Sequence, residues 1–292
     1  MTQTTKTILL SVLVSFAVTF TAANWLGWGG DTQTKTAAKE SVYDRVMRTK
    51  TIRCGYTLRP GFVMKDVNSG QLSGVVVDYV RELGSGLSLN VEWNDEIAPG
   101  EVGAALDSGK IDLYCAALWP NAPRARVMDM VMPIATSVMG VYIRNNETRQ
   151  FTDYQQLNDP AVTVALIDGT APAQIIQRLF PAVKKYALPQ LTPHTDLALA
   201  VESGKADFAL IDSYAAEEFM AHNPGKIKQL VLSKPFATFP NSIALKRGEY
   251  EFKRMLEIST LELIGTGVIE KIVKKYEQHP GTIIPAKYLL SM

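Results

Sequence analysis

The sequence predicts an α/β protein made of two lobes of one design, connected by two crossing strands. The main observation is a repeated pattern, AALDSGKIDLYCAAL at residues 104–118 and LAVESGKADFALIDS at residues 199–213. In each copy, apolar residues at helical spacing lead into Ser-Gly-Lys and an Asp, and an apolar run typical of a buried strand follows. Because open α/β sheets bind ligands at the carboxyl ends of their strands, two such lobes predict a ligand-binding cleft.

Both copies of the pattern contain the signals that end a helix. Gly109 and Gly204 fit the left-handed position that follows the last helical residue. Lys110 and Lys205 come next and complement the negative end of the helix. We therefore expect a helix-to-strand junction at each site.

The first lobe is expected to begin near residue 41. Its predicted elements are helix 41–50, strand 51–56, helix 75–83, strand 88–93, helix 101–108 and strand 111–118. Residues 138–144 are predicted to form a strand that leaves this lobe. The polar, turn-rich residues 145–160 then indicate a boundary.

The second lobe repeats the alternation of strands and helices. Its predicted elements are strand 161–167, helix 171–180, strand 186–190, helix 195–203, strand 206–211 and helix 213–221. Residues 230–245 are extended and contain prolines, which predicts a return crossing, and residues 250–278 predict two helices. The predicted lobes are therefore residues 41–143 with 241–292, and residues 144–240.

Composition and charge restrict the function. The chain of 292 residues is 47% apolar with a formal net charge of +1, so it can bury a globular core but has no field to attract nucleic acid. Its three histidines and two cysteines show no spacing typical of a zinc, haem or iron–sulfur site. We expect no nucleic-acid partner, no metal and no cofactor.

The N-terminus predicts export. Residues 7–23 are almost wholly apolar, and two tryptophans follow at residues 25 and 28. The segment fits an uncleaved membrane anchor, because tryptophans suit the membrane interface, and it fits a signal peptide, because its apolar core is short. Both alternatives stay open for residues 1–28, and residues 29–40 are expected to form a linker.

Two cysteines lie in strands that we expect to be neighbours. Cys54 falls in the run 51–56 and Cys115 in the run 111–118. Export permits a disulfide between them. We favour the alternative that both are small buried core residues, because adjacent parallel strands rarely offer the geometry that a disulfide requires.

Several short motifs occur in a specific order. They are GQLSGVVVD at 70–78, LDSGKID at 106–112, PRAR at 123–126 followed by Asp129 and Pro133, DGT at 168–170, SGKAD at 203–207 with Asp212, and GTG at 265–267. This order resembles extracellular solute-binding proteins of family 3, which include the polar amino-acid receptors of ABC transporters. The resemblance covers roughly residues 41–280. It implies a type II periplasmic-binding fold, with two lobes and a hinge of two crossing strands.

The resemblance implies the site residues. Arg124 falls where the family places an arginine for a ligand carboxylate, and its planar fork suits two parallel hydrogen bonds; the alternative is a surface arginine. Thr170, after Gly169, begins a helix and is expected to hold the same carboxylate, with a plain N-cap as its compatible alternative. Asp212 falls where the family places an acid for a ligand amine, and its alternative is also an N-cap.

Other positions depart from the family's pattern. Trp119 and Ala117 stand where amino-acid receptors carry small hydroxyl residues, and Trp119 is expected to stack on the ligand or to fill part of the pocket. Tyr56 and Arg59 stand where the family often has a polar group and an aromatic. Arg59 is expected either to make the pocket cationic together with Arg124 or to point to water. These departures therefore weaken the prediction that the ligand is an ordinary α-amino acid.

These observations predict a binding protein and no enzyme. The chain lacks the G-x-S-x-G, H-E-x-x-H and phosphate-loop motifs, and His194 and His222 fall in solvent-like contexts. The expected function is to close around a small carboxylate-bearing solute in the periplasm and to deliver it to an inner-membrane ABC permease. The first alternative is a membrane-tethered sensory or accessory module. A less favoured alternative is an enzyme like cyclohexadienyl dehydratase, with Asp212 or Glu101 as its acid.

Overall fold

The computed structural model describes residues 40–232 and 236–287. The chain divides into residues 1–40 and a folded unit that begins at Ser41. The predicted signal peptide or anchor therefore lies outside the described residues. Within the two described ranges, no helix is both long enough and apolar enough to cross a membrane.

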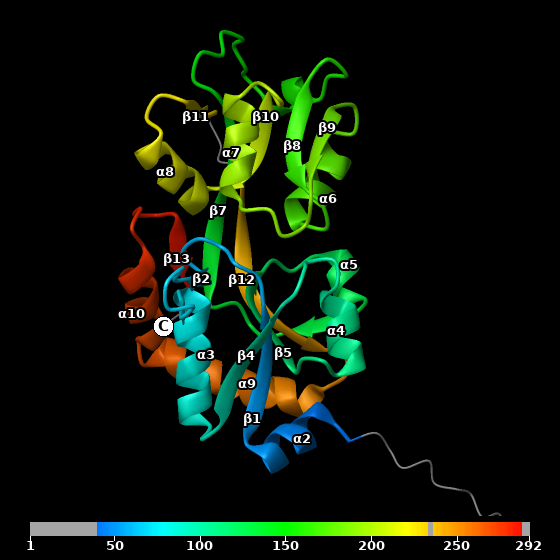
Figure 1. The fold of residues 1–292 in the computed structure, drawn as a ribbon, viewed down its shortest axis with the longest axis vertical. Coiled ribbons are helices and arrows are strands. Elements are labelled where there is room, and N and C mark those ends of the chain that lie inside the picture. Colours follow the sequence, from blue (N-terminus) through cyan, green and yellow to red (C-terminus); the bar gives the residue numbers. More distant parts are fainter. Residues whose placement is uncertain (1–39, 233–235, 288–292) are drawn as a thin grey trace, which may run out of the picture. The chain divides into compact units, whose positions relative to one another are not determined.

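The folded unit has the predicted two-lobed α/β architecture (Figure 1). Its main strands follow the order β4-β1-β5-β12-β7-β10-β8-β9. They are β4 (Asn90–Glu96), β1 (Thr51–Tyr56), β5 (Leu113–Leu118), β12 (Ala237–Lys246), β7 (Ala135–Arg144), β10 (Phe208–Asp212), β8 (Thr163–Ile167) and β9 (Lys184–Leu188). We call the part built on β4, β1 and β5 lobe 1 and the part built on β10, β8 and β9 lobe 2.

The long strands β7 and β12 form the hinge. They pair in antiparallel register from Ala237 opposite Met139 to Asn241 opposite Ala135, and both run from one lobe into the other (Figure 1). This agrees with the prediction of two crossing strands. The residue boundaries of the lobes themselves stay a prediction.

Helices cover both faces of the sheet in lobe 1. They are α2 (Val42–Thr49), α3 (Val75–Gly86), α4 (Val102–Ser108), α5 (Ala122–Ala125), α9 (Tyr250–Gly265) and α10 (Val268–Tyr276). Alternate residues of β5 pack on opposite sides: Cys115 joins the core under α3, α9 and α10, whereas Ala116 joins the core under α4. This burial on both faces explains why the strand reads as a continuous apolar run.

Lobe 2 is built in the same way. Its helices are α6 (Ala171–Leu179), α7 (Thr195–Glu202) and α8 (Ser213–His222), with a short 3-10 helix η1 (Tyr154–Leu157) before them. Leu210 packs in the core under α6, and its neighbour Ile211 packs in the core under α7 and α8. The shortest elements, β2 (Met64–Lys65), β3 (Leu72–Ser73), β6 (Met128–Met130), β11 (Ile227–Gln229) and β13 (Ile283–Pro285), were not predicted because they are too brief to show periodicity.

The glycines of the repeated pattern have the predicted conformation. Gly109 and Gly204 have φ values of 75° and 78°, just after helices α4 and α7. Both angles lie in the left-handed region, where glycine carries no steric penalty. The prediction of a helix-to-strand junction at each copy is therefore confirmed.

The aspartate of each copy holds the first strand of its lobe. In lobe 1, Asp112 N donates to Arg53 O at 2.9 Å, and Arg53 N donates to Asp112 Oδ2 at 2.8 Å. In lobe 2, Asp207 N donates to Thr163 O at 2.7 Å, and Thr163 N donates to Asp207 Oδ2 at 2.8 Å. The repeated pattern is therefore a structural device that is used once in each lobe.

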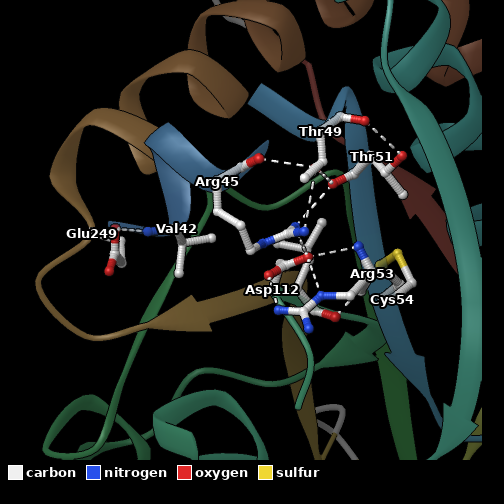
Figure 2. A network of polar contacts seen from close by, with 10 residues as sticks. Val42, Arg45, Thr49, Thr51, Arg53, Cys54, Asp112 and Glu249 are labelled. Carbon is white, nitrogen blue, oxygen red and sulfur yellow. Dashed lines mark hydrogen bonds and ion pairs between the residues drawn. A yellow bond between two sulfur atoms is a disulfide. The ribbon is translucent and has the colours of Figure 1, made fainter. Parts of the chain in front are cut away.

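Arginines neutralise both aspartates. The fully buried Asp112 accepts from the guanidinium groups of Arg45 and Arg53 (Figure 2). Asp207 is paired with Arg144 at 3.2 Å and with Arg149 at 3.0 Å, but its side chain is 23% exposed. Because water screens exposed charges, the Asp112 cluster should contribute more to stability than the Asp207 cluster.

We predict that Asp112→Asn lowers the free energy of unfolding by about 3 kcal/mol or more, because it removes the fully buried charge that accepts from two partly buried arginines. Asp207→Asn is the matched variant in the other lobe and should lower it by a smaller amount. Urea unfolding followed by circular dichroism measures both values. Equal losses, or a larger loss for Asp207→Asn, would contradict this explanation.

The two cysteines form a disulfide, so the favoured interpretation of two free core residues is wrong. Strands β1 and β5 are parallel neighbours in which Cys54 lies opposite Leu113. Cys115 lies two residues further along β5 and points to the same core. This diagonal placement brings the two Cα atoms to 5.5 Å, within the range that a disulfide spans.

We predict that replacing both cysteines by alanine lowers the free energy of unfolding by about 2–4 kcal/mol, because the bond restricts the unfolded chain over a separation of 61 residues. Urea unfolding with and without a thiol reductant measures the effect. The reductant should weaken the wild-type protein and leave the double variant unchanged. A wild-type protein that is insensitive to complete reduction would contradict the prediction.

Candidate functional site

A cavity of about 90 Å³ lies between the two lobes. A single water molecule needs about 10–15 Å³ of such space, so the cavity has room for more than one water or for a small solute. Six of the eight predicted site residues line it, namely Arg59, Ala117, Trp119, Arg124, Thr170 and Asp212. Arg59, Ala117, Trp119 and Arg124 come from lobe 1, and Thr170 and Asp212 come from lobe 2. The cavity thus lies where the sheet topology predicts a cleft.

Tyr56 and Gly169 do not line the cavity. The Tyr56 ring packs edge-on against Trp93 in the core of lobe 1, with ring centroids 6.1 Å apart. Gly169 has φ of 74° and forms the turn before α6. Its neighbour across the cleft is Gly100, whose N–H donates to Gln190 Oε1 at 3.0 Å and so joins the two lobes.

Arg124 is a buried cation without a carboxylate partner. Helix α5, which is capped by the side chain of Asn121, carries it, and its side chain lines the cavity with the residue only 8% exposed. Its Nη1 donates to Trp119 O at 2.7 Å, and no described Asp or Glu lies within ion-pair distance. The alternative of a surface arginine is therefore wrong.

The environment of Arg124 is unfavourable for a positive charge. Burial, together with the nearby positive charge of Arg59, lowers the pKa of Arg124 to about 10. Because a buried charge is costly unless it is paired, this guanidinium favours an incoming anion. A carboxylate matches its fork of donors.

Thr170 forms the N-cap of α6. Its hydroxyl donates to Ile167 O at 2.6 Å and accepts from Ala173 N at 3.5 Å. The N-cap interpretation is confirmed, and Thr170 also lines the cavity. Pro172 in the first turn has no N–H, so this helix start offers one donor fewer to an anion.

Arg59 is held inside the protein. Its Nη1 donates to Ala117 O at 2.7 Å and to Asn241 Oδ1 at 2.9 Å. Its Nη2 donates to Ser137 Oγ at 3.0 Å and to Asp212 Oδ2 at 2.6 Å. With 9% of the residue exposed, the alternative in which Arg59 points to water is wrong.

Two aromatic rings lie beside the Arg59 guanidinium. Its central carbon lies 4.5 Å from the ring centroid of Phe62 and 4.7 Å from that of Trp119. A planar cation is attracted to aromatic faces, most strongly where water is excluded. Trp119 also stacks on Phe239 at 4.6 Å, so its ring fills part of the site.

Asp212 is engaged by both of its oxygens. Oδ1 accepts from Tyr214 N at 3.1 Å, which confirms the N-cap interpretation for α8. Oδ2 accepts from Arg59, so this ion pair connects lobe 2 to lobe 1 at the base of the cleft. The acid for which the family resemblance implies a ligand amine is thus already paired with a guanidinium of the protein.

The sequence analysis missed two polar residues of the hinge strands. Asn241 on β12 is fully buried, and its Oδ1 accepts from Arg59 and also from Trp119 Nε1 at 2.8 Å. Its Nδ2 donates to Ser137 Oγ on β7 at 2.8 Å. In the sequence, Asn241 and Ser137 stand next to other polar residues, Ser242 and Thr136, and this pattern does not reveal a partner far along the chain.

His194 is the N-cap residue of α7, partly exposed at a helix end as expected, and it also lines the cavity. Burial, together with the positive charge of Arg59, lowers its pKa to about 4, although the carboxylate of Asp212 acts in the opposite direction. The imidazole is therefore neutral at neutral pH. His222, by contrast, is exposed, as expected.

We predict that His194 reduces stability in acid. The pKa of its ring is about 6.5 in the unfolded chain and about 4 in the folded protein, so the unfolded chain binds the extra proton between these values. Stability should therefore fall as the pH falls from about 6.5 to about 4. His194→Gln should flatten this part of the curve of unfolding free energy against pH, with exposed His222→Gln as control. Identical curves for wild type and His194→Gln would contradict the prediction.

A second cavity of about 380 Å³ adjoins the first. The two share lining residues that include Leu58, Arg59, Thr170 and His194. The rest of the second cavity is lined by apolar side chains and by charged and polar ones that include Lys65, Glu96, Gln190 and Glu218. Within residues 40–232 and 236–287, no group of His, Cys, Asp and Glu is placed to hold a metal ion.

This chain has two lobes joined by two hinge strands and a cavity between them, which is the arrangement of proteins that bind a ligand in a cleft. Residues 52–279 match the family of bacterial extracellular solute-binding proteins, family 3, and the chain belongs to this family. Amino-acid-binding protein AabA of Dichelobacter nodosus is 22% identical over 214 residues, which cover 71% of this chain and 80% of AabA. A probable histidine-binding protein of Neisseria gonorrhoeae is 20% identical over 73% of this chain and 78% of its own length.

Solved structures share the type II fold. An ancestral amino-acid-binding protein, described as a precursor of cyclohexadienyl dehydratase, superposes with a TM-score of 0.70 at 23% identity, covering 81% of this chain and 99% of that one. A mutant of ArgBP from T. maritima gives a TM-score of 0.70 at 20% identity, covering 82% of this chain and 100% of that one. These likenesses establish the fold.

Proposed function

We propose that the protein closes its two lobes around a small, carboxylate-bearing, amino-acid-like solute and delivers it to an ABC transporter. The observation that carries this proposal is the buried Arg124, which faces a cavity between the lobes without an acidic partner among the described residues. The names of the relatives, which are amino-acid-binding proteins, support the same class of solute.

Closure would follow from contacts made by both lobes. Among the described residues, polar contacts that join the lobes include Arg59 with Asp212, Gly100 with Gln190, and Asn121 Nδ2 with Gln174 Oε1 at 3.0 Å. Rotation about β7 and β12 would break or form these contacts together. A solute held by Arg124 in lobe 1 and by the wall of lobe 2 would bind the closed state best and shift the population toward it.

The proposed role is binding without catalysis. A dehydratase-like reaction would need an uncommitted acid in the cleft. Asp212 is the sole carboxylate among the residues that line the cavity, and it already accepts from Arg59 and Tyr214. Glu101 is exposed and does not line the cavity.

The proposed location is the periplasm, which agrees with a family of extracellular solute-binding proteins. Residues 1–28 would act as a signal peptide or would keep the protein at the inner membrane. The proposed membrane partner is the permease of the transporter, which would receive the solute from the closed cleft.

We predict that Arg124→Gln weakens binding of carboxylate solutes by about 2–5 kcal/mol, because it removes a buried charged hydrogen-bond donor. The measurement is a thermal-shift screen of amino acids, dicarboxylates and aromatic acids, followed by titration calorimetry of the hits. A solute at a hundred times its dissociation constant stabilises the protein by about 2.7 kcal/mol.

The matched control is Arg126→Gln. Arg126 is two residues away and exposed, so its replacement should leave affinity unchanged. If Arg124→Gln bound the hits as tightly as the wild type, the carboxylate site would have to lie elsewhere.

A further inference from the structure

We propose that Arg59 is a built-in substitute for a ligand ammonium group, and that the solute of this protein is a small monocarboxylate without an amino group. This inference rests on the proposed function and narrows its solute class. It follows from four features of the cavity: the state of Arg59, the state of Asp212, the balance of charge and the apolar lining.

Arg59 is fixed as part of the site. Both terminal nitrogens of its guanidinium donate to protein acceptors, and these acceptors come from lobe 1, from lobe 2 and from both hinge strands. The rings of Phe62 and Trp119 hold it by further contacts. A solute would have to replace all of these contacts to displace the group, which a molecule of the cavity's size cannot do.

The carboxylate of Asp212 would attract a second cation only weakly, because both of its oxygens already accept hydrogen bonds. Its Oδ2 accepts from Arg59 at 2.6 Å and its Oδ1 caps α8, and no other acid lines this cavity. A bound ammonium group would lie in the field of two guanidinium groups and would have to compete for a carboxylate that is already neutralised. Removal of its hydration without a matching partner is costly.

The side chains that line the cavity carry a net charge of one positive unit, which is that of Arg124. Arg59 and Asp212 cancel each other, and the neutral His194 adds no charge. Arg124 remains, with a single hydrogen bond to Trp119 O. Lys65, Glu96 and Glu218 face the adjoining cavity instead. One carboxylate therefore balances the site.

Apart from Thr57, Tyr114, Thr170 and His194, the remaining wall is apolar, and the hydroxyls of Thr57, Tyr114 and Thr170 are already hydrogen-bonded within the protein. Leu58, Pro99, Met139, Leu166, Leu197 and Leu210 line the cavity. These side chains offer no hydrogen bonds to a second polar group, but they favour a short aliphatic chain by removing it from water. The site thus fits a carboxylate attached to a small hydrocarbon group.

The first test compares matched pairs of solutes on the wild-type protein by titration calorimetry. The pairs are propanoate with alanine, 3-methylbutanoate with valine, and 4-methylpentanoate with leucine, which differ only by the α-ammonium group. The carboxylate of at least one pair should bind more tightly than its amino acid, on the order of 10- to 100-fold, as expected when a buried charged group lacks a partner.

The second test changes the substitute cation. Arg59→Met keeps much of the apolar volume and releases Asp212, so affinity for the amino acid of the pair should rise relative to that for the carboxylate. The matched control, Arg59→Met combined with Asp212→Asn, removes the freed charge and should restore the preference for the carboxylate. Circular dichroism checks that each variant folds. If a variant does not fold, the comparison of matched solutes on the wild-type protein still tests the inference.

The outcomes separate this inference from the proposed function. If the amino acids bind the wild-type protein as tightly as their carboxylates or more tightly, the inference is wrong and the proposed function stands. If neither the matched pairs nor the wider panel bind, the proposed function fails and the inference fails with it. A preference for the carboxylate that Arg59→Met leaves unaltered would show that Arg59 does not cause it.

Discussion

The ion pair between Arg59 and Asp212 organises the centre of this protein. It connects the two lobes, and Arg59 also contacts Ser137 and Asn241 on the two hinge strands. Its burial explains the surrounding residues, because buried charges need partners and further hydrogen bonds to offset their loss of hydration. Trp119 stabilises this centre in two ways. Its ring lies beside the Arg59 guanidinium, and its Nε1 donates a hydrogen bond to Asn241 Oδ1.

Two similar lobes surround this centre, and in each of them one aspartate connects neighbouring strands by hydrogen bonds. Asp112 and Asp207 bind the backbone of the first strand in their own lobe and are neutralised by arginines. In lobe 1 a disulfide between β1 and β5 adds a covalent connection close to Asp112. The polar contacts between the lobes lie at the cleft, where the proposed solute would act on them.

Much of this arrangement can be predicted from the sequence, because its causes are local. Helical spacing, Gly109, Gly204 and the apolar strand runs determine the elements without reference to distant residues. The site is harder to predict, because its contacts join residues far apart in the chain. Asp212 lies 153 positions from Arg59, and Asn241 lies 182 positions from it. The same reason hid the role of His194, whose pKa depends on charges from other elements. The disulfide was set aside for a different reason, because the expected adjacency of the strands does not show that Cys115 lies diagonally across from Cys54.

The central claim is that Arg59 and Asp212 are coupled in the folded protein. A double-mutant cycle with Arg59→Met, Asp212→Asn and the combined variant measures this coupling from the free energies of unfolding in urea, without any solute. The account predicts a favourable coupling of about 1 to 3 kcal/mol, as found for residues in direct polar contact. A coupling close to zero would mean that the two side chains act independently, and it would contradict the account of the site.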